Sequence, residues 1–439
     1  MSRQAFTIII LTFIGLIVGG LLFYFFIYKA PGTDVPKVSI GTLFPFGQNS
    51  DPIDTSNPNQ TDITDTTDGG QTENADLPDL RKLWDKPVVA STSFERKVLI
   101  PVEPQTISVD TTTATTLVAP LPTIEVTKTV VRFIERTTGH VHDIYTDEAT
   151  AVDVTNTTIP RLQEAYFANG GNNVIVRYLQ SDNSTIETYN ASVGTTKNQY
   201  GLSDVTGFYL EKNIFEVAIS PLGDKIFYLY PFGDATIGVL DNLAGTNKKQ
   251  ILNSTFSEWL PQFASETEIL LTTKASGYAP GYTYILSTTE PNVLKKILGD
   301  INGLTAYSIK NGDFVLFSKI VNKGPALYKY NRESREESSL SALGLPSKCV
   351  WSQAKQATFC AEPSFIPTGV YPDDWYQGKM FFTDKIWQIN SEANVAYLIS
   401  DLTSESGEGI DATHLEISPD GNYLHFINKR DGMLWGLQL

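Results

Sequence analysis

Cysteine, histidine and positive charge are all scarce in this chain of 439 residues. Its two cysteines exclude a scaffold held by many disulfides and any four-cysteine zinc or iron–sulfur site. Four histidines leave little scope for imidazole chemistry. Lys and Arg total 33 against 49 Asp and Glu, which gives a net charge of −16, whereas a nucleic-acid ligand requires clustered positive charge. We therefore expect no nucleic-acid partner.

The short motifs of common enzyme active sites are also missing. The sequence contains no G-x-S-x-G, G-x-x-x-x-G-K-[ST], G-x-G-x-x-G or H-E-x-x-H. His140 and His142 would share one face of a strand beside Asp143, but no third metal ligand accompanies them. The sequence pattern therefore predicts no metal, no cofactor and no catalytic residue.

The N-terminus carries an unbroken apolar run. Residues 6–27 contain no charged side chain, and a helix of this length spans the hydrocarbon layer of about 30 Å. The run is too long for the apolar region of a cleavable signal peptide, and no small-x-small site ends it. We predict a cytoplasmic tail at 1–5 and a single transmembrane signal anchor at 6–28, with the rest of the chain outside the cytoplasm.

Residues 29–124 are expected to form an acidic linker rich in Thr and Pro. Much of this stretch has almost no large apolar side chain, so it cannot bury enough surface to offset chain entropy and is predicted to be disordered. A short ordered segment is expected near 77–91, where Leu80, Leu83 and Trp84 would share one helical face. This segment would either clasp the main domain or continue the tether.

One hairpin pattern recurs from residue 125 onward, where the hydrophobic period becomes two. Copies at 215–230 and 414–427 run strand, S-P-x-G turn, strand, and four weaker copies fit the same frame. The second strands of the six copies begin in register at Val174, Ile226, Ile269, Phe314, Thr358 and Leu424. Strand-rich repeats of about 45 residues are typical of a β-propeller.

We therefore predict an all-β fold, with a β-propeller over 125–439 that follows the transmembrane helix and the disordered linker. The last repeat ends without its outer strand, and the hairpin at 129–146 would supply it in a six-bladed ring. If that hairpin belongs to a separate blade, the count is seven.

The two cysteines occupy matching places in one hairpin. Folding that hairpin about its turn sets Cys349 opposite Cys360, at a separation of about 4.5–5.5 Å that a disulfide can bridge. A structural disulfide is expected if the domain lies outside the cytoplasm. The alternative is two buried thiols in the core of a blade.

The longest gap between repeats holds an aromatic insertion at 362–382. Loops on a rigid scaffold commonly carry binding sites, and Trp and Tyr are favoured contact residues. We predict a binding surface there, with the alternative that the rings only pack the insertion onto the propeller. The residues concerned are Tyr371, Asp373, Asp374, Trp375 and Tyr376.

The hairpins at 220–228 and 418–426 follow S-P-x-G-x-x-(I/L)-x-(F/Y) and resemble WD40-like repeats of the TolB type. The whole arrangement, including the stretches FIERTTGH and DDWYQG, also resembles signal-anchored propellers of small-genome bacteria. Propellers of these kinds mostly act as binding platforms, and some are accessory domains of peptidases.

Together with the anchor, the tether and the lack of catalytic motifs, this resemblance implies a membrane-anchored extracytoplasmic platform. Its partner would be a protein or glycan of the cell envelope. The alternative is a hydrolase or lyase whose active site converges on the central channel of the propeller. Polar residues gathered in that channel from several blades would favour the alternative.

Overall fold

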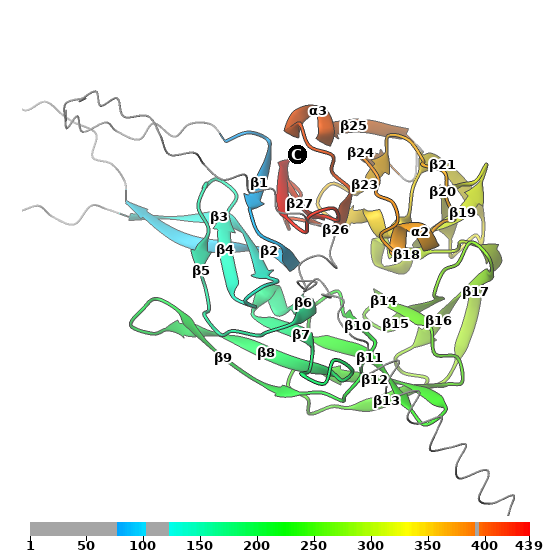
Figure 1. Cartoon of the computed structure of the whole chain (residues 1–439), viewed down its shortest axis with the longest axis horizontal. Coiled ribbons are helices and arrows are strands. Elements are labelled where there is room, and N and C mark those ends of the chain that lie inside the picture. The colour runs from blue at the N-terminus through cyan, green and yellow to red at the C-terminus, as the bar shows by residue number, and fades with distance from the viewer. Residues whose placement is uncertain (1–76, 102–122, 391–394) are drawn as a thin grey trace, which may run out of the picture. The chain divides into compact units, whose positions relative to one another are not determined.

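The computed structural model describes residues 77–101, 123–390 and 395–439, which form seven four-stranded antiparallel sheets. The sheets follow one another around a ring, and the colours in Figure 1 pass from blue through green and yellow to red around it. The described chain is thus a seven-bladed β-propeller, all-β apart from a few short helical turns.

The tail at 1–5, the anchor at 6–28 and the linker up to residue 76 lie outside the described residues. Among the helices of the described ranges, none has the length and apolar character needed to cross a bilayer.

Blades 1 to 4 follow chain order, each from its innermost to its outermost strand. Blade 1 comprises β2 (Val88–Pro101), β3 (Thr123–Glu135), β4 (Val141–Tyr145) and β5 (Val152–Asp153). Blade 2 comprises β6 (Leu162–Ala168), β7 (Asn173–Leu179), β8 (Ile186–Lys197) and β9 (Ser203–Tyr209). Blade 3 comprises β10 (Glu216–Ile219), β11 (Lys225–Phe232), β12 (Ala235–Asn242) and β13 (Lys249–Ser254). Blade 4 comprises β14 (Trp259–Ser265), β15 (Glu268–Thr273), β16 (Pro280–Ser287) and β17 (Leu294–Asn302).

Blades 5 and 6 continue the series and carry the short helices. Blade 5 comprises β18 (Ala306–Ile309), β19 (Phe314–Val321), β20 (Gly324–Asn331) and β21 (Glu337–Leu343). Blade 6 comprises β22 (Cys349–Ser352), β23 (Ala357–Pro363), β24 (Asp384–Asn390) and β25 (Val395–Asp401). The helical turns are η3 (Asn169–Gly171), η4 (Lys310–Gly312), η5 (Pro346–Lys348), α2 (Asp373–Tyr376) and α3 (Leu402–Ser406).

Blade 7 takes its outermost strand from the other end of the described chain. β26 (Ala412–Ile417), β27 (Tyr423–Asn428) and β28 (Leu434–Gln438) are joined by β1 (Leu80–Trp84), in which Leu80 pairs with Leu437. The prediction that the hairpin at 129–146 supplies this strand is wrong, because that hairpin is β3–β4 of blade 1. The propeller therefore begins at β1 rather than at residue 125.

The segment that contains β1 is a strand and not the expected helix. Its pairing with β28 shifts register between Lys82 and Trp84, and both Leu80 and Leu83 are buried. Leu80 packs in the core between blades 6 and 7, whereas Leu83 packs in the core between blades 7 and 1, so both faces of β1 are covered. Two buried leucines three residues apart also have the spacing of a helical face, which explains why the sequence pattern favoured a helix.

The recurring hairpin is confirmed in all six predicted copies. The aligned positions fall in the second strand of blades 2 to 7, namely Val174 in β7, Ile226 in β11, Ile269 in β15, Phe314 in β19, Thr358 in β23 and Leu424 in β27. Blade 1 does not match the repeat because residues 102–122 separate its first two strands.

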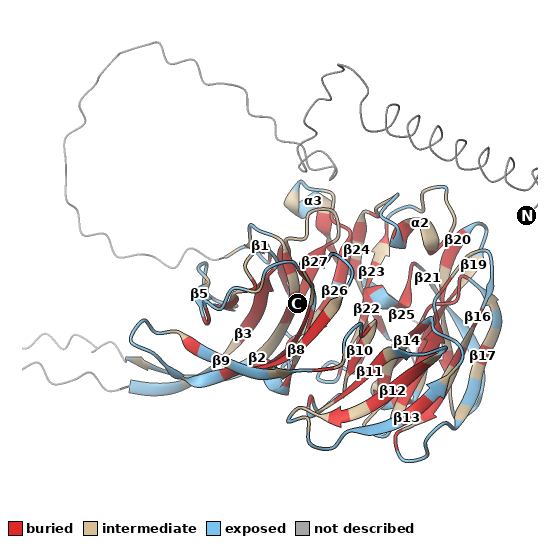
Figure 2. Ribbon diagram, turned by 60° about the horizontal axis from the view of Figure 1, so that its bottom comes forward, coloured by how far each residue is buried: buried red, intermediate tan, exposed pale blue. Residues whose placement is uncertain are grey.

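Apolar runs such as KIFYLY reflect blades that are covered on both faces. In β11, Ile226 and Tyr228 pack with blade 2, whereas Phe227 and Leu229 pack with blade 4. The middle strands of the blades are accordingly buried along much of their length, and Figure 2 shows these buried residues in red. Both alternating sets of side chains are apolar because each belongs to a core.

The S-P-x-G turn has a specific hydrogen-bonding pattern. Gly223 adopts φ +68°, which favours glycine, and its N–H donates to the carbonyl of Ser220 at 2.8 Å. The Ser220 hydroxyl then accepts from the N–H of Lys225 at 3.0 Å. The same turn recurs between β26 and β27, so the motif marks the step from the channel-lining strand to the next strand outward.

Candidate functional site

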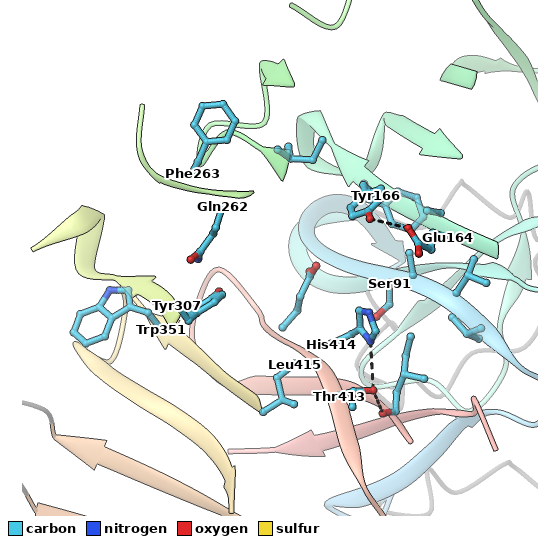
Figure 3. A pocket seen from close by; sticks show the side chains of 18 of the residues that line it. Ser91, Glu164, Tyr166, Gln262, Phe263, Tyr307, Trp351, Thr413, His414 and Leu415 are labelled. Carbon is cyan, nitrogen blue, oxygen red and sulfur yellow. Dashed lines mark hydrogen bonds between the residues drawn. The ribbon is translucent and has the colours of Figure 1, made fainter. Parts of the chain in front are cut away.

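A cavity of about 1130 Å³ lies where the innermost strands of the seven blades meet. Its lining includes residues from β2, β6, β10, β14, β18, β22 and β26 (Figure 3). No single element forms this site, so it depends on closure of the ring.

One side of the cavity is acidic. Glu164 on β6 accepts a hydrogen bond from the Tyr166 hydroxyl at 3.0 Å and forms an ion pair with Arg177. Nearby on β10, burial and the Glu164 carboxylate raise the pKa of Glu216 to about 7, while Arg177 and Lys274 oppose the rise. Glu216 therefore changes charge near neutral pH.

β26 contributes a histidine and a second carboxyl of this kind. The pairing of β26 with β27 shifts register between Thr413 and Glu416, and His414 within the bulge adopts φ +51° and lines the cavity. Bulges commonly redirect side chains beside functional sites. Both side chains keep contact with solvent, and desolvation by the surrounding channel lowers the pKa of His414 and raises the pKa of Glu416 to about 7.

Aromatic and amide residues of blades 4 to 6 also line the cavity. Tyr307 on β18 and Trp351 on β22 pack against the same core cluster and lie across the opening from Glu164 in Figure 3. Gln262 on β14 is held by Ser308, whose N–H donates to Oε1 at 2.7 Å. Burial raises the pKa of Tyr307 to about 12, with the carboxylate of Glu416 adding to the rise.

One serine that lines the cavity is paired with a histidine. The Ser91 hydroxyl on β2 lies 2.9 Å from Nδ1 of His425 on β27, and Nε2 of His425 lies 3.9 Å from Oε2 of Glu416. His425 is fully buried, and burial lowers its pKa to about 3. With its proton on Nε2, the neutral ring accepts the serine hydroxyl at Nδ1.

The predicted aromatic contact residues are mostly in a core. Tyr371 and Trp375 are only 2% and 4% exposed, and both rings stack on Phe382 at centroid distances of 5.9 Å. These two side chains are not available at the surface. Their place matches the alternative in which the rings pack the insertion onto the propeller.

The two predicted aspartates hold the insertion in shape. Asp373 accepts from the Ser276 hydroxyl at 2.9 Å and from the Gly277 N–H at 2.7 Å, which ties α2 to blade 4. Asp374 accepts from the N–H of Val370 at 2.8 Å within the insertion. Both carboxylates therefore have structural partners.

Tyr376 differs from these residues because it is 41% exposed. Desolvation of its hydroxyl raises the pKa of Tyr376 to about 12, with the carboxylate of Glu216 in blade 3 adding to the rise and a hydrogen bond with Ser347 opposing it. Tyr376 therefore lies within the electrostatic reach of Glu216.

The cysteines face one another across β22 and β23. Cys349 pairs with Cys360 in the strand register, and the two sulfur atoms form a disulfide. Both residues are buried in the core between blades 5 and 6. The bond closes the hairpin next to the insertion.

The histidine and acid cluster of blade 1 is occupied by ion pairs. Asp143 forms ion pairs with Arg132 and with Arg96, each at 2.7 Å. His142 Nδ1 lies 2.9 Å from Asp153 Oδ1. Across the described ranges, no group of three or more His, Cys, Asp or Glu side chains is arranged to hold a metal ion.

Sequence reasoning missed the residues of the channel. The hairpin alignment located the first strand of each repeat, and many of the side chains that line the channel lie on those strands. Each repeat contributes only a few of these side chains, so no single repeat shows the site. Polar residues on the first strands, such as Glu164 and Glu416, were the available signal.

No protein-family model matches the chain, and no curated protein sequence matches it. Solved propellers resemble its fold at low identity. Oligogalacturonate lyase from Vibrio parahaemolyticus aligns at 10% identity and a TM-score of 0.48, over 71% of this chain and 86% of the lyase. The propeller domain of the Trilobed protease from Pyrococcus furiosus aligns at 14% identity and a TM-score of 0.40, over 61% of this chain and 77% of that domain.

Prolyl oligopeptidase B from Galerina marginata aligns at 9% identity and a TM-score of 0.44, over 68% of this chain but only 45% of the peptidase. A structure described as TolB from Agrobacterium tumefaciens aligns at 11% identity and a TM-score of 0.37, over 52% of this chain and 74% of that one. These similarities concern the fold, and the function has to be argued from the residues of this chain.

Proposed function

We propose that this propeller binds an uncharged oligosaccharide of the cell envelope in its central channel. The observation that carries the proposal is the axial cavity, whose lining brings Tyr307 and Trp351 together with carboxyl and amide groups from other blades. Saccharide hydroxyls donate to such carboxyl and amide oxygens. The apolar faces of sugar rings pack on aromatic side chains, which combine a large apolar surface with a polar edge.

The recessed position of these groups favours a narrow ligand over a protein surface. Ligand sites of small molecules are concave, with a few polar groups that fix orientation. In the insertion, by contrast, Tyr371 and Trp375 are buried in a core cluster and are not available to a partner. A glycan that enters the channel therefore fits the chain better than a protein partner docked on those rings.

The proposal includes a location. The apolar run at 6–28 would anchor the protein, with a cytoplasmic N-terminus and the propeller outside the cytoplasm. The disulfide between Cys349 and Cys360 supports this placement, because such bonds persist in oxidising compartments.

Isothermal titration calorimetry on the full chain in detergent tests the proposal, with chitohexaose and maltohexaose as neutral probes. We expect at least one probe to bind, and Trp351→Ala or Tyr307→Ala to weaken binding about tenfold or more. Tyr397→Ala, which removes a 61% exposed ring on β25, is the matched control and should leave binding unchanged. Absence of binding at millimolar probe, or an equal loss in all three variants, contradicts the proposal.

A second candidate function rests on the Ser91–His425 contact. A serine hydroxyl that lines a cavity and bonds a neutral imidazole is the arrangement of a nucleophile and its base in acyl transfer. A hydrolase of this kind should react with a fluorophosphonate probe at Ser91, and Ser91→Ala should abolish the label. If the folded protein is not labelled, the channel is a binding site without this chemistry.

A further inference from the structure

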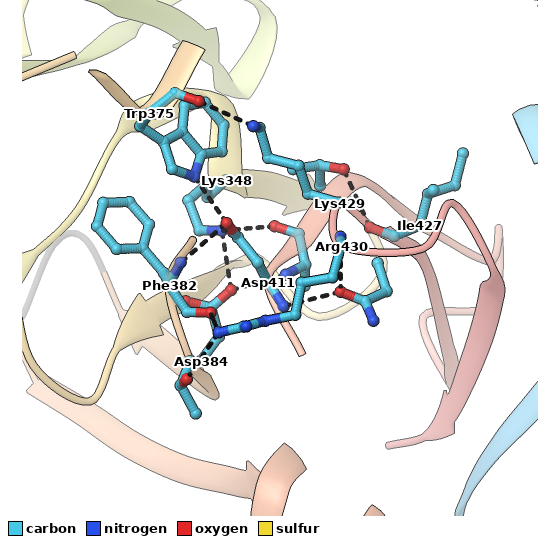
Figure 4. A network of polar contacts seen from close by, with 12 residues as sticks. Lys348, Trp375, Phe382, Asp384, Asp411, Ile427, Lys429 and Arg430 are labelled. Atoms are coloured by element: carbon cyan, nitrogen blue, oxygen red, sulfur yellow. Dashed lines mark hydrogen bonds and ion pairs between the residues drawn. The ribbon is translucent and has the colours of Figure 1, made fainter. Parts of the chain in front are cut away.

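An amine and two carboxyl groups are enclosed where blades 6 and 7 meet (Figure 4). The side chains of Lys348, Asp384 and Asp411 are all 0% exposed. Nζ of Lys348 lies 2.5 Å from Oδ1 of Asp411 and 2.8 Å from Oδ2 of Asp384. The rings of Trp375 and Phe382 cover this ammonium, with centroids 5.3 and 5.4 Å from Nζ. Bulk water is therefore excluded from the three groups.

The two oxygens of Asp411 have different surroundings. Oδ2 accepts from the indole Nε1 of Trp375 at 2.8 Å and from the backbone N–H of Phe382 at 2.9 Å. Oδ1 faces the amine of Lys348. Two fixed donors on one oxygen stabilise negative charge there, as in an oxyanion hole. The carboxyl carbon is thus presented to the amine with one oxygen held in place.

Asp384 is placed to carry protons between these groups. Its Oδ2 accepts from the N–H of Ala412 at 2.7 Å and contacts Lys348, while its Oδ1 is buried without a hydrogen-bond partner among the described residues. Burial raises the pKa of Asp384 to about 6, with Asp411 adding to the rise and Lys348 opposing it. A carboxyl group in this range both accepts and releases a proton near neutral pH.

We propose that Lys348 and Asp411 condense into an intramolecular isopeptide bond, with Asp384 as the proton carrier. Nζ attacks Cγ of Asp411, a C–N bond forms, and the bond between Cγ and Oδ1 breaks. One of the three ammonium hydrogens stays on the amide nitrogen, and Asp384 passes the other two to Oδ1, which leaves as water. Oδ2 remains as the amide oxygen, still held by Trp375 and Phe382.

Burial favours the product of this reaction. An enclosed ammonium–carboxylate pair carries the desolvation cost of two charges, whereas an amide is neutral and keeps the two hydrogen bonds on its oxygen. The bond would connect η5, directly before β22, to the residue directly before β26. It would therefore link blade 6 to blade 7 covalently.

Peptide mapping of the full chain after reduction and trypsin digestion tests the proposal. We expect a branched peptide that joins 336–355, uncleaved at Lys348, to 386–429, with a mass lower by one water than the sum of its parts. Lys319 and Glu337 provide an internal control, because Nζ and Oε2 are also 2.5 Å apart but the side chains are 30% and 38% exposed. Their peptides should stay separate.

Three variants separate the roles. Lys348→Met removes the nucleophile and should give only linear peptides, and Asp384→Asn should lose or strongly reduce the branched product. Asp411→Asn should still give the same branched peptide, because attack on the Asn side chain forms the same amide and releases ammonia in place of water. A branch that contains 380–385 would make Asp384 the acceptor and overturn the assigned roles.

The wild-type protein alone is decisive, so the result does not depend on whether a variant folds. Complete cleavage after Lys348, together with an intact reduced mass equal to that of the unmodified sequence, would overturn the proposal.

Discussion

Leu80 in β1 pairs with Leu437 in β28, so the two ends of the described chain lie in one sheet. The propeller is thus closed by β1, which comes before all other strands in the sequence but belongs to the last blade. Side chains of β1 should therefore matter to stability as much as those of the repeats.

Leu83→Ala should destabilise the whole domain although it lies outside the recurring hairpins. Leu83 is 6% exposed, and removing a buried leucine side chain lowers the free energy of unfolding by about 3 kcal/mol. Chemical denaturation measures the change. Leu99→Ala, at a leucine that is 68% exposed, is the control and should change stability by about 0.5 kcal/mol or less. Equal effects of the two substitutions would show that β1 does not close the ring.

Loss of the disulfide should weaken blade 6. The cysteines are 11 residues apart, and closing a loop of this size in the unfolded chain contributes about 2–3 kcal/mol. The double variant Cys349→Ser, Cys360→Ser should unfold at lower denaturant than the wild type. Adding reductant should shift the wild type toward the variant and leave the variant where it is. If reductant has no effect on either, the thiols are not bonded.

Glu216 and Glu416 should make the folded protein less stable as the pH rises through neutrality. Desolvation raises the pKa of both from 4.5 to about 7, so the folded state binds protons more tightly than the unfolded chain. Their contribution is complete below about pH 4.5 and is lost as the pH rises through 7. Because the Glu416 side chain is 44% exposed, solvent screens part of its contribution, and the melting temperature at pH 8 should be lower than at pH 6 by about one to two degrees.

The double variant Glu216→Gln, Glu416→Gln is uncharged at both positions and should remove most of this difference. Asp182→Asn is the control, because hydrogen bonds from Thr185 lower the pKa of that exposed aspartate and it stays ionised at both pH values. A control variant that also flattens the pH dependence would refute its assignment to these two glutamates.

Trp375 and Tyr376 should respond differently to alanine substitution, although they are adjacent. Trp375 packs in a core and donates to Asp411, so its loss should lower the free energy of unfolding by about 3–5 kcal/mol. Tyr376 is exposed, and its loss should change stability by about 1 kcal/mol or less. Thermal unfolding of the two single variants measures the contrast, and similar losses would contradict the burial of Trp375.

The sequence predicted the parts of the fold that depend on local repetition. The hairpin frame placed the second strands of blades 2 to 7 and set Cys349 opposite Cys360, because strand pairing across a short turn is fixed by neighbouring residues. The closing strand was not predicted as a strand, because Leu80 and Leu83 are buried on opposite faces of β1 and their spacing of three residues is also that of a helical face. Blade 1 was not recognised as a repeat because its first turn is replaced by residues 102–122.

The site was less accessible to sequence reasoning because it exists only in three dimensions. Glu164, His414 and Glu416 line one cavity but come from blades 2 and 7, and nothing in their local sequence relates them. The aromatic insertion drew attention through its composition, yet Trp375 is buried and donates to Asp411, which comes from a different blade. Convergence of distant segments is a property of the closed ring.

The position of β1 also determines which strand pair bears tension applied to the N-terminal part of the chain, and when the ring can close during synthesis. Residues 1–76 enter the propeller at β1, so tension along that part of the chain acts first on the hydrogen bonds between β1 and β28. During synthesis, β1 is made before any blade, and its partner is made after all of them. The first strand to appear must therefore remain unpaired until the last one is available, and its pairing is the longest-range step in forming the ring.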